Sequence, residues 1–371
     1  MKGTVLITGG AGFIGSHLAS ELLEAGYHVR VLDSLVPQVH GPSRSRPSYL
    51  HPDAELIVGD VRDADILEDA LSGVDAVYHF VALVGVGQSM YQISEYTSVN
   101  NVGTATLLEQ LVKRPVARLI VASSMSVYGE GLYLSPEGRK YDQAIRRAEQ
   151  LKAHQWEMMT HDGLPLRPVA TPESKQPSLA SVYALSKYDQ EQMCLIVGRA
   201  YGIPTVALRF FNVYGPHQSL SNPYTGVLAI FGSRLLNDKR PIIFEDGEQL
   251  RDFVSVYDIA QACRLALEKE NAKDAVFNIG SGETVSVATV AERLARVLGK
   301  QIEPEVSGKY RVGDIRHCFP DVSRAYTVLG YKPTYTLERG MGELAEWLER
   351  QTADDRFGEM RAELTARGLV V

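Results

Sequence analysis

The stretch TGGAGFIG, at residues 8–15, decides the fold of this 371-residue chain. An apolar run at residues 5–7 precedes it, and apolar residues at helical spacing follow it. Gly9 permits a tight turn, Gly12 lets a pyrophosphate approach the backbone, and Gly15 lets the helix pack closely on the strand. The N–H groups at the start of that helix are free to bind phosphate oxygens. The stretch therefore predicts a strand, a dinucleotide-binding turn and a helix.

Strands and helices alternate on both sides of this motif. Short apolar runs predict strands, and stretches with helical spacing lie between them. These strands are expected at residues 29–32, 56–58, 76–81, 119–122 and 205–210. Such alternation predicts an α/β fold, with a doubly wound, Rossmann-type parallel sheet and right-handed crossovers.

The order of these elements predicts two lobes. Residues 1–212 are expected to form the dinucleotide-binding Rossmann domain. Residues 213–371 read as mainly a smaller C-terminal α/β substrate-binding lobe, with about 251–268 returning to the Rossmann domain. The tail, from Glu343 on, reads as helical and polar.

Residues 131–180 interrupt the alternation and read as an insertion on the surface. We expect a charged amphipathic helix at residues 140–159 and a proline-rich segment after it. The insertion leaves from a predicted strand end and returns just before a YALSK motif at residues 183–187. Both anchors carry candidate catalytic residues, Ser124 and Tyr183, so we expect the insertion to lie over or beside the substrate pocket and to shape the substrate site.

Two aspartates end the second and third predicted strands. The carboxylate of Asp33 can accept hydrogen bonds from adenosine ribose hydroxyls and would repel a 2′-phosphate. No arginine directly follows it, so the sequence favours NAD over NADP. Asp60 and Val61 lie where a side chain can reach adenine, although an ordinary loop aspartate at position 60 remains an alternative.

A candidate catalytic pair lies in YALSK. Tyr183 and Lys187 are four residues apart on a predicted helix and therefore share a face. A nearby ammonium favours the phenolate form of a tyrosine that must act as a base. The stretch VASSMSVYG, at residues 121–129, places Ser123, Ser124 and Ser126 at the end of a strand, where α/β sites form.

The ordered motifs TGGAGFIGS, GDVRD, HFVA, SSMSVYG, YALSK, LRFFNVYGP, RDFVSVYDIA and FNIGSGE resemble the extended short-chain dehydrogenase/reductase family, and its nucleotide-sugar epimerases and dehydratases in particular. HFVA departs mildly from the usual HxAA. The resemblance implies catalytic roles for Ser124, Tyr183 and Lys187 and no metal. It implies NAD contacts from Gly9, Gly12, Phe13, Ile14, Gly15, Asp33, Asp60, Val61, Val81, Ala82, Asn100, Tyr183, Lys187 and Phe211. It implies substrate contacts from Ser124, Ser126, Asn212 and Val227, and from Arg251 and Arg311, whose guanidinium groups would bind the pyrophosphate.

The resemblance also narrows the reaction. Dehydratases of the family carry an Asp-Glu pair where this chain has Met125 and Ser126, and neither of these can replace a carboxylic acid. A nucleotide-sugar 4-epimerase is therefore expected. The insertion and the segment SLSNPYTGVLAIF, at residues 219–231, resemble dTDP-L-rhamnose 4-epimerases, which form dTDP-6-deoxy-L-talose. UDP-glucose or UDP-N-acetylglucosamine 4-epimerase is the alternative. A dehydratase, an NADPH-consuming reductase and a non-catalytic NAD(P) sensor are disfavoured.

Composition excludes several other classes. The net charge of −7 argues against nucleic-acid binding. Cys194, Cys263 and Cys318 show no metal-binding or disulfide spacing, and we expect buried free thiols. No apolar run is long enough to span a membrane, so a cytoplasmic protein is expected.

The resemblance also implies a homodimer. Helices starting near Asn100 and Ser181 should pair across a two-fold axis as a four-helix bundle. Their apolar residues are Leu107, Leu108, Leu111, Met193, Leu195, Ile196 and Val197.

Overall fold

The structure, a computed structural model, describes residues 2–371 and is built on a parallel sheet of seven strands. The strand order is β14-β9-β5-β4-β1-β2-β3, and every neighbouring pair is parallel. The doubly wound sheet predicted from the sequence is confirmed. Its strands are β1 Thr4–Thr8, β2 His28–Asp33, β3 Glu55–Val58, β4 Ala76–His79, β5 Arg118–Ser124, β9 Thr205–Phe210 and β14 Ala275–Ile279.

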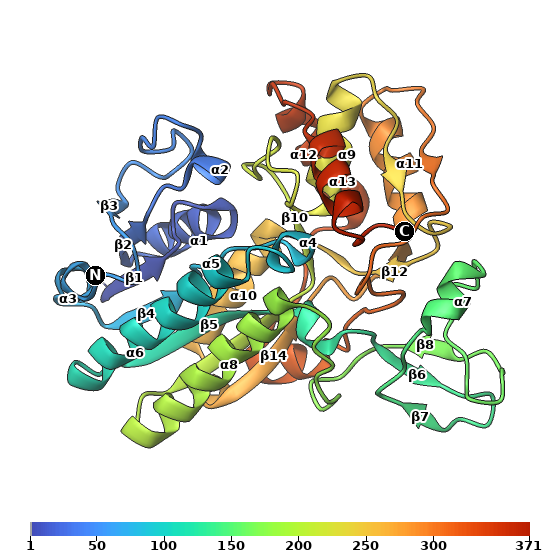
Figure 1. Ribbon diagram of the computed structural model, residues 1–371. Helices are drawn as coiled ribbons and strands as arrows, with labels where there is room; N and C mark the ends of the chain where they lie inside the picture. The colour runs from blue at the N-terminus through green and yellow to red at the C-terminus, as the bar shows by residue number, and fades with distance from the viewer. Residues whose placement is uncertain (1) are drawn as a thin grey trace.

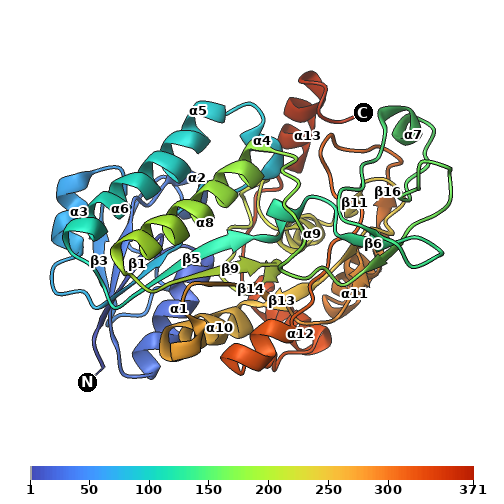
Figure 2. The same cartoon turned by 90° about the horizontal axis from the view of Figure 1, so that it is seen from below.

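Helices cover both faces of the sheet (Figures 1 and 2). On one face α1 (Phe13–Glu24) packs against α10 (Val256–Glu268). On the other face α6 (Gly103–Lys113) packs against α8 (Val182–Tyr201) and α3 (Ala64–Ala70). Each face has its own buried apolar cluster. Because α10 and β14 belong to the second half of the sequence, the chain returns to the sheet after entering the other lobe.

The direction of the winding reverses beside β1. Strands β2 and β3 lie on one side of β1, whereas β4, β5, β9 and β14 lie on the other. The loops after β1 and β4 therefore diverge and leave a crevice at the carboxyl ends of the strands, where ligands of such sheets bind. Gly9, Asp33 and Ser124 lie at or just after the ends of β1, β2 and β5.

The smaller lobe packs three helices around an apolar core of its own. These are α9 (Val227–Leu236), α11 (Val287–Val297) and α12 (Leu337–Leu348), joined by short strand pairs. The pairs are β10 (Asn212–Tyr214) with β13 (Phe253–Ser255), β11 (Ile242–Ile243) with β16 (Glu305–Val306), and β12 (Leu250–Arg251) with β15 (Val285–Ser286).

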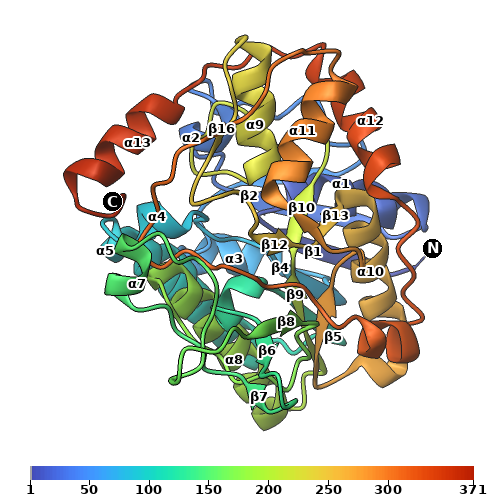
Figure 3. The ribbon, with the colours of Figure 1, turned by 90° about the vertical axis from the view of Figure 1, so that its right-hand side faces the viewer.

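The C-terminal tail is helical, as expected, but it is not simply polar. Its last helix, α13 (Phe357–Ala366), buries Phe357, Met360 and Leu364 against the smaller lobe. Figure 3 shows α13 close to α4 (Val86–Ser89), which belongs to the Rossmann half. These buried residues are spaced three and four apart, so they share one face of α13.

The insertion forms a small antiparallel sheet that projects from the body (Figure 1). The sheet has the order β7-β6-β8, with β6 at Leu132–Leu134, β7 at Lys140–Tyr141 and β8 at Arg167–Val169. The helix expected over residues 140–159 is wrong, because only α7 (Ala148–Lys152) is helical there. Tyr141, Ala144 and Met158 pack into the insertion's own apolar cluster. This packing overrides helix propensity.

Other expectations concern exposure. The three cysteines are buried free thiols, as predicted. Leu107, Leu108, Leu111 and Leu195 are buried within the subunit and cannot form a dimer face, whereas Ile196 is 55% exposed. Over residues 2–371 no helix combines the length and the apolar character needed to cross a bilayer.

Candidate active site

A cavity of about 630 Å³ lies at the carboxyl ends of the strands, between the sheet and the smaller lobe. Asn100 and Lys187 do not line it, and neither does any residue of the insertion. The insertion therefore does not line the pocket, but its Arg146 donates to the carbonyl oxygen of the lining residue Asp314, so it lies beside the pocket as expected. That it shapes the substrate site stays a prediction. The predicted residues that do line the cavity are Gly9, Gly12, Phe13, Ile14, Gly15, Asp33, Asp60, Val61, Val81, Ala82, Ser124, Ser126, Tyr183, Phe211, Asn212, Val227, Arg251 and Arg311.

The glycine turn has the shape that a dinucleotide requires. Gly9 has a φ of 72°, and a Cβ there would lie 2.8 Å from the amide nitrogen of Val81. A Cβ on Gly15 would lie 2.5 Å from the Cα of Gly10, inside the contact between helix α1 and the turn. Neither position has room for a side chain, so the turn is packed as closely as a dinucleotide-binding turn requires, and both glycines line the cavity where a pyrophosphate would bind.

Asp33 is held at the cavity wall by backbone donors. Its Oδ2 accepts from the Ala11 amide at 3.1 Å, and its Oδ1 accepts from the Leu35 amide at 2.9 Å. The His40 Nε2 lies 3.6 Å from Oδ1. A carboxylate fixed in this way still has free lone pairs for ribose hydroxyls, and its charge opposes a phosphate.

Asp60 faces the cavity but pairs with a neighbour. Its Oδ2 lies 2.6 Å from the Arg62 Nη2, and the Arg62 hydrogen bonds lower the pKa of its carboxyl. Val61 beside it is buried and lines the same wall. Asp60 and Val61 can both contact an adenine ring, although the Asp60 carboxylate is also paired with Arg62.

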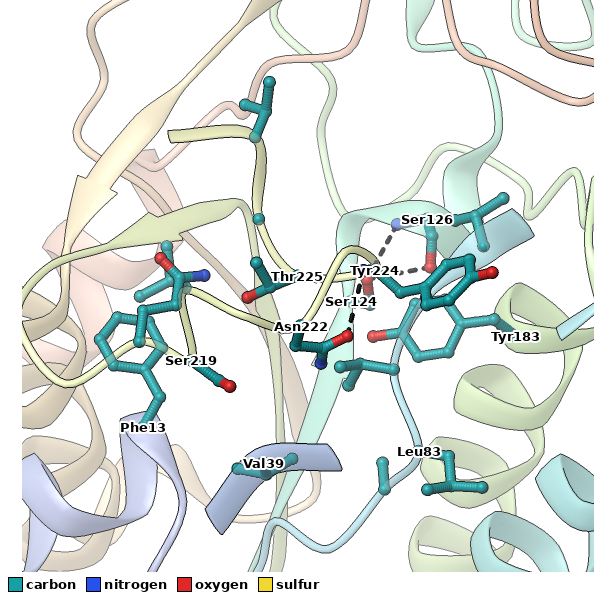
Figure 4. A pocket seen from close by; sticks show the side chains of 18 of the residues that line it. Phe13, Val39, Leu83, Ser124, Ser126, Tyr183, Ser219, Asn222, Tyr224 and Thr225 are labelled. Atoms are coloured by element: carbon teal, nitrogen blue, oxygen red, sulfur yellow. Dashed lines mark hydrogen bonds between the residues drawn. The ribbon is translucent and has the colours of Figure 1, made fainter. Parts of the chain in front are cut away.

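Ser124 begins the short 3₁₀ turn η2 (Met125–Tyr128) after β5. Its Oγ accepts from the Ser126 hydroxyl at 2.9 Å and from the Ser126 amide at 3.2 Å (Figure 4). Because both contacts use lone pairs, the Ser124 hydrogen is left to donate to a neighbouring oxygen. Ser124 can therefore act as a hydrogen-bond donor toward Tyr183 or a bound sugar.

Tyr183 lies in the first turn of α8, where the Ser181 side chain caps the helix. The Ser89 hydroxyl accepts from the Tyr183 amide at 3.0 Å, which fixes this turn against α4. Burial raises the pKa of the Tyr183 phenol, and the Ser124 hydroxyl beside it acts in the opposite direction. The phenol needs a positive charge nearby before it can serve as a base at neutral pH.

Lys187 is buried one turn further along α8. Its Nζ donates to the Gln190 Oε1 at 2.7 Å, so the ammonium is held behind the cavity wall. Burial lowers the pKa of Lys187 to about 8, partly opposed by the negative potentials of Cys194 and Glu191. Lys187 can therefore exchange its proton near neutral pH.

A buried polar network that the sequence did not predict supports Lys187. Gln190 donates to the Thr104 hydroxyl at 2.9 Å, and Thr104 lies 2.8 Å from the His79 Nε2. The other ring nitrogen of His79 contacts the Thr8 hydroxyl at 2.9 Å. Burial, with the nearby Lys187 charge, lowers the pKa of His79 to about 3, so this histidine is neutral. In the sequence, the histidine of HFVA, His79, was the residue that could have pointed to this network.

Asn100 positions a loop behind the wall. It lies in a π-helical segment, η1 (Thr97–Val102), between α5 (Ile93–Tyr96) and α6. Its side chain accepts from the Leu83 amide at 2.8 Å and donates to the Leu83 carbonyl at 3.1 Å and to the Ser186 hydroxyl at 2.9 Å. Asn100 thus fixes the cavity-lining segment after β4, and its expected cofactor contact stays a prediction.

Arg251 faces the cavity from the smaller lobe. Its Nη1 donates to the carbonyl oxygens of Leu250 and Arg316, and its Nη2 donates to that of Ile315. An arginine has five N–H donors, so the Nε–H and one Nη2–H have no partner within residues 2–371. These two donors form the fork that suits a phosphate.

Arg311 lies on the same wall and is only partly occupied. Its Nε and Nη2 donate to the Asp314 Oδ2 at 3.1 and 2.9 Å, and its guanidinium stacks 4.8 Å above the Phe244 ring. The Nη1 donors stay available. Arg251 and Arg311 together give this part of the cavity the positive charge that a diphosphate needs.

Sequence analysis missed the apolar wall that the C-terminal segment gives to the cavity. Phe357, Met360, Leu364 and Leu369 line it together with Phe244. The spacing of Phe357, Met360 and Leu364, three and four residues apart, could have indicated this apolar face from the sequence. These side chains make that part of the cavity wall apolar.

Comparisons with known proteins agree with this geometry. The family described as "NAD dependent epimerase/dehydratase family" matches residues 5–153 and 159–280. The dTDP-L-rhamnose 4-epimerase of Burkholderia thailandensis is 40% identical, over 94% of this chain and 95% of that protein. The structure of Thermotoga maritima UDP-glucose 4-epimerase with UDP-glucose is 31% identical and has a TM-score of 0.77, covering 94% and 99% of the two chains. That of the Thermus thermophilus UDP-glucose 4-epimerase complex with NAD is 27% identical, with a TM-score of 0.76 and coverage of 94% and 100%. The chain therefore belongs to the NAD-dependent epimerase/dehydratase family of enzymes, and NAD is its cofactor.

Proposed function

We propose that this enzyme is a nucleotide-sugar 4-epimerase and that its substrate is dTDP-L-rhamnose, which it converts to dTDP-6-deoxy-L-talose. The observation that carries the reaction type is the grouping of Ser124, Ser126 and Tyr183 in the cavity (Figure 4), which Arg251 and Arg311 also line. A nucleotide sugar anchored at Arg251 and Arg311 would present its sugar ring toward Tyr183.

Bound NAD supplies the group that accepts a hydride from the sugar and returns it in the same cycle. The chain's own residues handle the proton. Tyr183 removes the proton of the C4 hydroxyl as a general base, and Ser124 donates a hydrogen bond to the same oxygen. After the 4-keto sugar rotates in the cavity so that its opposite face receives the hydride, Tyr183 returns the proton to the C4 oxygen.

The residues beside Ser124 argue against dehydration. Elimination across C5 and C6 needs an acid and a base next to the sugar, and the two positions after Ser124 are Met125 and Ser126. Ser126 instead donates its hydroxyl hydrogen to Ser124. Oxidation and reduction at C4 are the chemistry that the remaining groups can perform.

The choice of dTDP-L-rhamnose rests on one sequence similarity and on the apolar character of one cavity wall. The relative with that activity is 40% identical over nearly its full length, whereas the UDP-glucose 4-epimerase of Thermotoga maritima is 31% identical. The wall formed by Phe357, Met360 and Leu364 is also apolar, which suits a 6-deoxy sugar and a thymine better than hydroxyl-rich groups. UDP-glucose and UDP-N-acetylglucosamine are the alternatives.

A substrate panel tests this proposal. The purified enzyme, without added cofactor, is incubated with dTDP-L-rhamnose, UDP-glucose and UDP-N-acetylglucosamine, and the sugars are separated by chromatography. We expect the C4 epimer of dTDP-L-rhamnose to form fastest. Faster turnover of either UDP-sugar would refute the substrate, and no epimer from any of them would refute the reaction.

We also propose that the enzyme is a cytoplasmic homodimer that pairs through α6 and α8, as predicted. Exposed apolar side chains on α8 and on η1, the segment that leads into α6, support the pairing: Val102 is 51% exposed, Leu185 46% and Ile196 55%. Helices α6 and α8 lie side by side on one outer face of the sheet (Figure 2).

A further inference from the structure

No residue of the insertion lines the cavity, yet a buried arginine joins the insertion to the smaller lobe. Arg146 belongs to the insertion, and its side chain is only 4% exposed. Its Nη1 donates to the Glu245 Oε1 at 2.6 Å, and its Nη2 donates to the Asp314 carbonyl oxygen at 3.0 Å. A buried guanidinium is stable only when such partners satisfy it, so these contacts fix the insertion's position.

The segment that Arg146 contacts, residues 311–317, contains one of the two proposed diphosphate-binding arginines and contacts the other. Arg311 belongs to the segment and donates to the Asp314 carboxylate. Arg251 lies outside it but donates to the carbonyl oxygens of Ile315 and Arg316. Asp314 is therefore a junction: its carbonyl contacts the insertion, and its carboxylate contacts a cavity arginine.

A second set of contacts fastens the other end of the segment. Glu157 of the insertion pairs with the Arg316 guanidinium, and its Oε2 lies 3.0 Å from the His317 Nε2. Glu130, just before the insertion, accepts from the backbone amides of Arg316 and His317 at 2.7 and 3.2 Å. The insertion and its first flanking residue thus contact the segment at Asp314 and again at residues 316–317.

We propose that Arg146 is a positioning residue, which holds Asp314 so that Arg311 and Arg251 keep their free donors toward the diphosphate of a nucleotide sugar. The insertion therefore acts on substrate affinity without touching the substrate. This inference rests on the proposed function for the identity of the anion.

The charges around Asp314 agree with this role. Burial acts to raise the pKa of its carboxyl, but the positive charges of Arg311, Arg251 and Arg146 together lower it below its ordinary value. Asp314 is thus ionised and holds Arg311 by a charge-assisted pair. Without the Arg146 hydrogen bond to the Asp314 carbonyl, residues 311–317 can move. Part of the binding free energy of the ligand is then spent on ordering Arg311 and Arg251.

The test compares three variants with the wild-type enzyme. Arg146→Met removes the hydrogen bond to the Asp314 carbonyl. It also removes one partner of the buried Glu245 carboxylate, which lowers stability. Arg146→Met with Glu245→Gln replaces that carboxylate, which would otherwise keep only its contact with Arg316, by a neutral amide whose oxygen can still accept from Arg316, and should recover stability. Arg147→Met is the matched control, because the neighbouring arginine is exposed. Each protein is measured for thermal midpoint, for KM and kcat with dTDP-L-rhamnose, and for Kd with dTDP by calorimetry.

We expect both Arg146 variants to raise KM and the Kd for dTDP about tenfold, the size of one lost hydrogen bond to a charged group, with kcat nearly unchanged. Arg147→Met should match wild type. The inference is overturned if the double variant recovers KM together with its thermal midpoint, or if Arg147→Met raises KM equally. If the wild type epimerises no nucleotide sugar but Arg146→Met still weakens dTDP binding, the proposed function fails and this inference stands.

Discussion

Replacing Lys187 with methionine should abolish catalysis and yet make the protein more stable at neutral pH. Burial lowers the pKa of Lys187 from 10.5 to about 8, which corresponds to about 3 kcal/mol of destabilisation when the ammonium is protonated. The substitution also removes the 2.7 Å bond to Gln190, which offsets about 1 kcal/mol of the gain. We therefore expect Lys187→Met to be about 2 kcal/mol more stable at pH 7.

The pH dependence of this difference is the sharper test. Between pH 8 and 10.5 the folded protein has released the Lys187 proton, whereas the unfolded chain still holds it. The stability of the wild type therefore rises with pH across that window, and the advantage of Lys187→Met shrinks. Urea midpoints of both proteins, freed of cofactor, are measured from pH 7 to 10. A difference that stays constant over this range would refute the buried, low-pKa lysine.

Further expectations follow from the cavity wall and from the surface. Tyr183→Phe should lower kcat by about 10²–10⁴-fold with little change in KM, because it removes the base and leaves Arg251 and Arg311, and steady-state kinetics would show otherwise if the base lies elsewhere. Ser124→Ala should be milder, since it removes a hydrogen bond and not the base. Nucleotide extracted from the wild type should be NAD or NADH, and Asp33→Ala should gain affinity for NADP; recovery of NADP from the wild type would contradict the role of Asp33. Ile196→Asp should give a monomer by light scattering where the wild type is a dimer, because it places a charge in the proposed apolar interface, whereas an unchanged mass would move that interface away from α8.

The glycine turn, Asp33 and the serine stretch could be read from the sequence because their roles are local. Gly9 is required by a positive φ in a turn between adjacent elements, and Ser124 follows directly from a strand end. Local patterns of this kind specify backbone geometry before any distant contact forms. The parallel sheet followed from the same alternation of strand and helix.

The contacts that sequence analysis missed are nonlocal. Lys187 shares a helix face with Tyr183, but its Nζ is directed by Gln190, whose amide is in turn fixed by Thr104 on another helix. Residues 140–159 have helical spacing, yet burial of Met158 and the pairing of Arg146 with Glu245 take them out of a continuous helix. Neither the charge pairing nor the burial is visible from spacing alone.

The central claim is oxidation and reduction at C4 of one sugar, and isotope labelling tests it most directly. The enzyme is incubated in heavy water with dTDP-L-rhamnose, and separately in ordinary water with substrate that carries deuterium at C4, and the products are examined by NMR and mass spectrometry. The account predicts a dTDP-6-deoxy-L-talose that keeps its C4 deuterium and takes up no solvent label at C5. Loss of the C4 deuterium, or solvent label at C5, would contradict it, because either result requires proton chemistry that the groups beside Ser124 and Tyr183 do not supply.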